Sequence, residues 1–375
     1  MNKASNNRHA TVHGRVFVLA ALCLLISLLL WQSQQQLTAA NDPESGPPFM
    51  VEYPLPAHLP DAEPRHIIAE APGRLWFTLP GVNALGSLVV TATVDYTFVI
   101  YAIPTANSEP HNLVLDSTNQ AIWFTQLAAS QIGRFDLTTH QFEEFALPAN
   151  TSPTGIDLDS SGMVWVALRD SNQIARLNPN TANIELFTYG VAGAAFADLA
   201  VSPANLIWMT SPGLNRLVAY EPVGQRFTFE PVVEIGLPPF PPQAIAMHGT
   251  RPWISAPTKG WLGRYAPGTF TSFLWFTTPP SASGPTGISY RGLGSTHEIW
   301  YVQSSANRAG RLLVDNGDSE IKNFVAGLPS ANSQPYDIVA DSNGHAWITA
   351  PGANAIAEWR PPYVVYTYLP LIRQP

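Results

Sequence analysis

The stretch from Pro110 to Pro148 reads PHNLVLDSTNQAIWFTQLAASQIGRFDLTTHQFEEFALP and contains four short runs of strand-forming residues. These runs cover His111–Leu115, Ala121–Gln126, Gln131–Leu137 and Phe142–Pro148. Polar turn-forming residues separate the runs, and apolar and polar residues alternate within the last one. Alternation of this kind between turn residues is typical of β-strands. We therefore predict that this stretch folds into a four-stranded antiparallel sheet.

The stretch is one of seven copies of a unit of roughly 45 residues, a period typical of repeat architectures. Each copy carries one tryptophan at the same place: Trp76, Trp123, Trp165, Trp208, Trp253, Trp300 and Trp347. Ten residues later each copy has a small or β-branched residue: Gly86, Gly133, Ala175, Val218, Gly263, Gly310 and Ala357. Six copies begin with a proline, and we align Ala195 with this position in the fourth: Pro64, Pro110, Pro153, Pro242, Pro285 and Pro335.

This repetition predicts the fold. One four-stranded sheet cannot cover its own faces, so neighbouring copies must pack against it. Sheets packed around a central axis leave only short, protected edges. We predict an all-β chain, with residues 49–362 forming a seven-bladed β-propeller of four-stranded antiparallel blades. The tryptophans are expected to lie between adjacent blades, where a large aromatic side chain removes about 150–250 Å² from water.

Closure of the ring is predicted from an extra copy of the last strand. The fourth run of the unit ends in aromatic-x-Leu/Ile-Pro, and this motif also stands alone at Tyr53–Pro56 and at Tyr366–Pro370. We expect Val51–Pro56 to complete the final blade and the tail 363–375 to lie outside it. In the reverse assignment the tail is the closing strand.

The N-terminus has the pattern of an export signal. Three basic residues precede the apolar run Val16–Trp31, which leads to the small residues Ala39 and Ala40. We predict that residues 1–40 are a signal peptide or a membrane anchor, followed by a linker at 41–48. The protein is thus expected to be extracellular or periplasmic, or membrane-tethered if the segment is not cleaved. Cys23 is the single cysteine, so cleavage after Ala40 leaves no thiol for disulfides or metal sites.

The charge of the chain limits the kinds of molecule that it is expected to bind. Charged residues make up 12% of the chain, its formal net charge is −8, and basic clusters are missing from the sequence. This argues against nucleic acid as a partner. We expect a monomer that binds a small molecule, a peptide or a glycan on its axial face, with membrane contact only through an uncleaved anchor.

A site is expected where the first strand of each unit begins and the second ends, because these ends reach the same face near the axis. The residues after the prolines are Arg65, His111, Thr154, Phe196, Gln243, Thr286 and Tyr336. The residues three after the tryptophans are Leu79, Gln126, Leu168, Ser211, Ala256, Gln303 and Ala350. This predicted ring contains no carboxylate. Our candidate substrate-binding residues are Arg65, His66, Gln126, Asp170, Gln243, Gln303, Tyr336 and Asp337.

Two further motifs are interpreted structurally. Asp157–Gly162 and Asp341–Gly344 resemble calcium-binding loops but lack the rest of that pattern, so we assign them to turns. The arginines that follow the small residue in four copies are expected to tie blades together: Arg134, Arg176, Arg264 and Arg311.

The units at Pro110–Phe135 and Leu75–Thr78 resemble those of the streptogramin lyases, also called virginiamycin B lyases. The resemblance runs through all seven units. It implies a seven-bladed propeller that opens a cyclic depsipeptide by elimination, with magnesium. The family's catalytic unit has Pro-His at the first strand and Trp-Phe-Thr-Glu at the end of the second. His111 matches this histidine and is our candidate catalytic residue, whereas Gln126 stands where the family has glutamate.

An amide does not titrate near neutral pH, as general acid–base catalysis requires. We therefore favour an exported binding or interaction module with a degenerate catalytic site. The first alternative is an active carbon–oxygen lyase, with His111 as the base, Asp170 or Asp337 as the other ionisable group, and magnesium as cofactor. The second is a metal-dependent lactonase-like hydrolase, which needs an axial cluster of carboxylates and asparagine. No metal ligand is assigned from the sequence.

Overall fold

The computed structural model describes residues 49–92, 95–233, 237–267, 272–278, 283–293, 296–315 and 321–361. The predicted signal peptide or anchor at 1–40, the linker at 41–48 and the tail at 363–375 lie outside these ranges. Met50–Arg360 forms one compact unit, and almost all of the second unit lies beyond the described residues. Within the described ranges, no helix has the length and apolar character needed to span a membrane.

Seven antiparallel sheets of four strands make up the compact unit. Their innermost strands are β2 (Ile67–Ala71), β6 (Pro110–Asp116), β10 (Pro153–Leu158), β14 (Asp198–Val201), β18 (Ile245–His248), β22 (Pro285–Leu293) and β26 (Ile338–Ala340). The second strands are β3 (Arg74–Leu79), β7 (Ala121–Gln126), β11 (Val164–Leu168), β15 (Ile207–Ser211), β19 (Arg251–Ala256), β23 (Thr296–Gln303) and β27 (Ala346–Ala350).

The third strands are β4 (Ala84–Ala92), β8 (Gln131–Asp136), β12 (Gln173–Asn178), β16 (Arg216–Glu221), β20 (Trp261–Tyr265), β24 (Arg308–Asp315) and β28 (Ala355–Arg360). The outer strands are β5 (Asp95–Ala102), β9 (Phe142–Ala146), β13 (Asn183–Thr188), β17 (Arg226–Pro231), β21 (Phe273–Thr277), β25 (Ile321–Gly327) and β1 (Phe49–Pro54). Short 3₁₀ turns follow three of the second strands: Pro80–Val82, Ser304–Ala306 and Pro351–Ala353.

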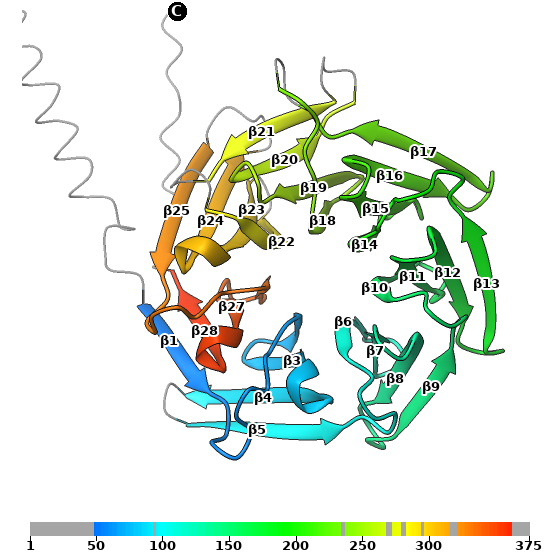
Figure 1. Ribbon diagram of the computed structural model, residues 1–375. Helices are drawn as coiled ribbons and strands as arrows, with labels where there is room; N and C mark the ends of the chain where they lie inside the picture. The colour runs from blue at the N-terminus through cyan, green and yellow to red at the C-terminus, as the bar shows by residue number, and fades with distance from the viewer. Residues whose placement is uncertain are drawn as a thin grey trace, which may run out of the picture. The chain divides into compact units, whose positions relative to one another are not determined.

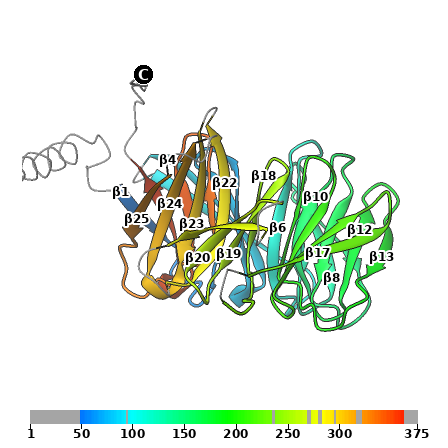
Figure 2. The same ribbon diagram turned by 90° about the horizontal axis from the view of Figure 1, so that it is seen from above.

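The sheets stand around a central axis as the blades of a propeller, which confirms the predicted fold (Figure 1). Turned by 90°, the propeller is seen from its edge (Figure 2). The seventh sheet has the order β1-β28-β27-β26, so the N-terminal strand supplies its outer edge. The ring is therefore closed by the N-terminal copy of the repeated strand, as its aromatic-x-Leu-Pro motif predicted.

The repeated tryptophans fill the layers between blades. All seven have an exposed fraction of 7% or less. Trp165 of the third blade packs in one cluster with Phe196, Leu199 and Tyr220 of the fourth. Trp347 of the last blade packs with residues of the first, so the same contact spans the closure of the ring. Each indole thus covers part of the next blade, a sheet that could not bury its own face.

Where the residue ten positions after the tryptophan is glycine, it makes room for an aromatic ring of an adjacent strand. Gly133 pairs with Phe124, and a Cβ added to Gly133 would lie 2.1 Å from Cζ of that ring. A Cβ added to Gly310 would likewise lie 2.0 Å from Cζ of Tyr301. In the four glycine copies the offset in the sequence therefore records cross-strand packing inside the blade.

A ring of hydroxyl groups joins successive blades around the axis. In five blades the side chain two residues after the tryptophan donates to a backbone carbonyl of the next blade: Thr78 to His111, Thr125 to Thr154, Thr210 to Gln243, Ser255 to Thr286 and Thr349 to Arg65. In the third and sixth blades this position is Ala167 or Val302, and a threonine of the first strand donates instead: Thr154 to Phe196 and Thr286 to Tyr336. Every junction thus has one such bond.

This ring gives a testable prediction. Thr125→Val keeps the volume of the buried side chain but removes the hydroxyl, which donates to the Thr154 carbonyl at 2.9 Å and accepts the Asn112 N–H at 3.0 Å. We expect the free energy of unfolding to fall by about 1–3 kcal/mol, because two buried backbone groups lose their partner. Chemical denaturation measures it. Thr188→Val, on an exposed strand position, is the control and should change stability by less than about 0.5 kcal/mol. Equal effects of the two changes would show that the hydroxyl ring contributes nothing.

The two aspartate motifs serve turns, as predicted, and also hold the indoles. Asp159 accepts the backbone N–H groups of Ser161 and Met163 and the indole N–H of Trp165 at 2.9 Å. Asp341 binds Trp347 in the same way.

The prediction that the repeated arginines tie blades together differs from the observed contacts. Each guanidinium lies over the tryptophan of its own blade, with 5.4–5.9 Å between the guanidinium carbon and the ring centroid. The reason is register: Trp123, for example, pairs directly with Arg134 across β7 and β8.

Candidate functional site

A cavity of about 500 Å³ lies on the propeller axis and is lined by residues from the inner strands of all seven blades. Two layers of side chains form its wall. The second residue after each proline, or its equivalent, gives the polar layer, a ring with His66, Asn112, Asp198, Ala244, Gly287 and Asp337. Gly155 holds this position in the third blade but does not line the cavity. The next residue is aliphatic and buried in every blade: Ile67, Leu113, Ile156, Leu199, Ile245, Ile288 and Ile338. The cavity therefore has a polar layer beside an apolar one.

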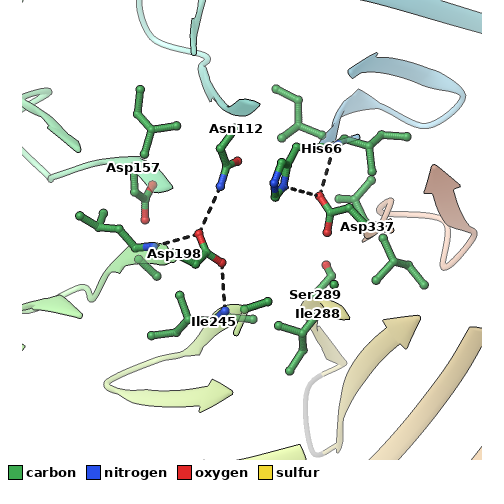
Figure 3. A pocket seen from close by; sticks show the side chains of 18 of the residues that line it. His66, Asn112, Asp157, Asp198, Ile245, Ile288, Ser289 and Asp337 are labelled. Atoms are coloured by element: carbon green, nitrogen blue, oxygen red, sulfur yellow. Dashed lines mark hydrogen bonds and ion pairs between the residues drawn. The ribbon is translucent and has the colours of Figure 1, made fainter. Parts of the chain in front are cut away.

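Asp337 and His66 form a pair across the junction of the last and first blades. The Asp337 carboxylate lies 3.1 Å from Nδ1 of His66 and accepts the backbone N–H of Ile67 at 3.2 Å (Figure 3). The Asp337 amide donates to Thr349 at 3.0 Å, which fixes the start of the inner strand. The pair is thus positioned by the backbones of two blades.

Asp198 occupies the matching position in the fourth blade. Its carboxylate accepts hydrogen bonds from the Asn112 side chain at 3.2 Å and from the backbone N–H groups of Leu199 and Ile245 at 2.9 and 3.0 Å (Figure 3). Burial raises the pKa of Asp198 to about 6, although the His66 charge and these N–H donors act in the opposite direction. This carboxylate is held by neutral donors alone.

Asp157 adds a third carboxylate two residues after the ring position of the third blade. It accepts the backbone N–H groups of Leu158 at 2.8 Å and Val201 at 2.7 Å. Burial also raises its pKa to about 6, against the effect of these two donors. Ser289 holds the equivalent place in the sixth blade and contacts the Ala340 N–H at 3.4 Å.

Glycines give two of these carboxylates their space. A Cβ added to Gly155 would lie 2.2 Å from the Leu199 nitrogen and 2.8 Å from Cα of Asp198. A Cβ on Gly287 would lie 2.6 Å from both Cα and Oδ1 of Asp337. Both glycines belong to a Pro-Thr-Gly-Ile motif, in the blade that precedes the aspartate.

Two imidazoles meet at one side of the cavity. The rings of His66 and His111 have centroids 4.8 Å apart, and Tyr336 lies edge-on to His66 at 5.3 Å. Within the described residues, Nε2 of His66 and Nδ1 of His111 are buried without a hydrogen-bond partner. Burial, followed by the charges of His66, Arg65 and Arg169, lowers the pKa of His111 well below its usual value of 6.5. His111 is therefore neutral at pH 7.

Five of the residues predicted from sequence line this cavity: His66, His111, Gln243, Tyr336 and Asp337. Four others lie outside its lining. Gln126 is fully buried and donates to Glu144 at 2.9 Å, and Gln303 is fully buried against Ser283. Arg65 lies over the Tyr336 ring at 5.7 Å, and Asp170 is paired with Arg169 at 3.0 Å.

The expectation of a ring without carboxylates was wrong. The predicted ring was built from the first residue after each motif proline. The second residue after the proline and its neighbours also face the axis. In the fourth unit the alignment was one residue early, because Ala197 and not Phe196 pairs with Thr210 in the way that Arg65 pairs with Thr78. The Pro-Thr-Gly-Ile motif was the available signal for Asp198 and Asp337, since a glycine there leaves space for a neighbour.

The lining does not fit a magnesium ion. Mg²⁺ requires oxygen ligands at 2.0–2.1 Å in near-octahedral geometry. In the described part of the chain, no group of three or more His, Cys, Asp or Glu residues is arranged to hold a metal. We derive no chemical step through this ion.

The comparisons with known proteins agree with this architecture. The model of the virginiamycin B lyase family matches residues 117–370. A streptogramin B lyase structure is 22% identical, with a TM-score of 0.71, over 84% of this chain and 97% of that one. Virginiamycin B lyase from Staphylococcus aureus is 20% identical, with a TM-score of 0.70, over 83% of this chain and 99% of that one. The same values hold for its catalytically inactive variant with quinupristin. A search of curated proteins finds no match.

Proposed function

Because the chain belongs to the virginiamycin B lyase family, we propose that its axial cavity binds a compact organic ligand and that the family's elimination chemistry is lost. The observation that carries this proposal is the position of Gln126. The resemblance places a catalytic glutamate there, but the side chain is an amide, is fully buried and is bonded to Glu144. A cavity of about 500 Å³ that mixes an apolar wall with a few polar groups is typical of small-molecule sites.

Binding is tested with ligand-observed NMR on a fragment set of cationic, neutral and anionic compounds. We expect ligands whose signals respond to the protein and are lost with Ala244→Trp, because this indole would occupy the cavity. Ala71→Trp, at an exposed position of the first blade, is the matched control and should keep them. Fragments that bind both variants equally, or no fragment at all, would contradict the proposed function.

A second candidate, a carbon–oxygen lyase, is favoured by one observation. The neutral His111 ring lies beside the ring of His66, which the Asp337 carboxylate orients. In such an elimination, a neutral imidazole would take the proton from the carbon next to a carbonyl. The ester C–O bond then breaks, a C=C bond forms, and the freed oxygen stays on the opened chain as a carboxylate while the imidazole keeps the proton.

The assay for this candidate uses a streptogramin B depsipeptide with magnesium, followed by chromatography and mass spectrometry. We expect no conversion by the protein. Ring opening without a change of mass, lost in His111→Ala, would establish the lyase instead. Ring opening that adds one water would point to the hydrolase alternative.

Export remains part of the proposal and is supported by the basic residues and apolar run at the N-terminus. Cell fractionation with N-terminal sequencing distinguishes a cleaved, released protein from a tethered one. A full-length protein in the cytosolic fraction would refute export.

A further inference from the structure

The charge of the cavity wall indicates which ligand the site takes, and this inference rests on the proposed binding function. We infer that the axial cavity selects a compact apolar ligand bearing a protonated amine, with the ammonium group held at the Asp198 carboxylate. The argument has three parts: the charge of the wall, its free hydrogen-bonding capacity and its apolar layer.

The wall is acidic, and among its described lining residues the potential cations are two imidazoles: His66, which faces Asp337, and His111, whose pKa is well below its usual value. Three carboxylates line the cavity, and no lysine or arginine is found among its lining residues in the described chain. Asp157 and Asp198 are bonded to neutral N–H groups only. Burying a charge without a counter-charge is costly, and the raised pKa of both carboxyl groups expresses that cost. A ligand cation would offset it.

The three carboxylates of the wall keep free acceptor sites. A carboxylate has about four lone-pair sites. Asp198 uses three of them, Asp157 two, and Asp337 two counting the His66 contact. An ammonium group brings three donors that reach oxygens about 2.7–2.9 Å away. A carboxylate ligand would bring only further acceptors and negative charge.

The aliphatic layer suits the rest of such a ligand. Ile67, Ile156, Leu199, Ile245 and Ile288 lie beside the polar ring and are each at most 7% exposed. A hydrocarbon body in the cavity would contact the edges of these side chains that the blades leave uncovered. The polar and apolar layers together therefore match an amine joined to a hydrocarbon body.

Three probes of nearly equal shape test the inference: cyclohexylmethylamine, cyclohexylmethanol and cyclohexanecarboxylate. Their dissociation constants are measured at pH 7.5 by NMR titration of the full protein. We expect the amine to bind at least tenfold more tightly than the alcohol, and the carboxylate more weakly than both. Alcohol binding as tight as amine binding, or preferred carboxylate binding, would overturn the inference.

Substitutions test whether the ammonium group of the ligand binds at Asp198. Asp198→Asn should weaken the amine at least tenfold and leave the alcohol within about twofold. Glu143→Gln, which removes an exposed carboxylate of the outer strand β9, is the control and should leave both unchanged. If Asp198→Asn does not fold by circular dichroism, Asp157→Asn is used, with the same direction of change expected. Equal amine affinity in the wild type and the folded variant would contradict the assignment.

The outcomes distinguish a failure of this inference from a failure of the proposed binding function. Cavity ligands found in the fragment set, with no preference for the amine among the three probes, would refute the charge selection and leave the binding function standing. No cavity ligand of any charge would refute both.

Discussion

Replacing Trp165 by alanine is expected to lower the free energy of unfolding by about 3–5 kcal/mol, the usual cost of removing a buried tryptophan. Its side chain is fully buried between the third and fourth blades. Ring centroids of Phe187 and Tyr220 lie 5.7 and 5.9 Å away. The indole would leave a cavity between two sheets that bury their apolar faces against each other. Equilibrium denaturation gives the value.

A matched pair of phenylalanine variants separates packing from hydrogen bonding. The Trp165 indole donates to Asp159 at 2.9 Å, whereas the Trp253 indole nitrogen has no partner among the described residues. Trp165→Phe should therefore cost about 1 kcal/mol more than Trp253→Phe. A loss below about 1 kcal/mol for Trp165→Ala would contradict the role of the tryptophans as wedges between blades.

Glu358→Gln is expected to destabilise the closing blade by about 1.5–3 kcal/mol at pH 7, because the half-buried Arg360 and the Tyr53 hydroxyl would lose the charged acceptor of their hydrogen bonds. The Glu358 side chain is 1% exposed. It accepts hydrogen bonds from Arg360 at 2.6 and 2.7 Å, from Tyr53 of the closing strand β1 at 2.6 Å, and lies 2.8 Å from Nδ1 of His345. This network connects the N-terminal strand to β28.

The effect has a defined pH dependence. Burial alone would raise the pKa of Glu358, but hydrogen bonds from His345, Arg360 and Tyr53 lower it from 4.5 to about 2. Stability from this group is thus complete above about pH 5 and is lost as the pH falls toward 2. The difference between wild type and Glu358→Gln should shrink over that range.

Glu143→Gln is the control for this second prediction. Glu143 is 59% exposed and forms a surface ion pair with Arg134 at 3.5 Å. Such pairs contribute about 0–1 kcal/mol, so the variant should remain near the wild type. Equal losses for Glu143→Gln and Glu358→Gln, or a loss independent of pH, would show that Glu358 does not secure the closure.

Much of the site could not be read from the repeat. The unit placed His111 and Tyr336 near the axis because their positions follow the motif proline. Asp198 escaped notice because the fourth unit lacks that proline and was aligned one residue early. Gln126 was expected at the axial face, but it is buried in its blade, where Glu144 accepts its amide. Side-chain direction within a strand depends on local partners, which periodicity does not specify.

By itself the sequence determined the number of blades and their strand order, and it reduced the closing strand to two candidates. The blade number follows from a repeated physical requirement, since each indole must be covered by the next sheet. Only the tertiary structure decided which polar groups share the cavity. Asp157, Asp198 and Asp337 belong to three blades, and they line one space because the inner strands converge on the axis. The polar contacts among these cavity residues leave no periodic trace, because each depends on one residue in one copy.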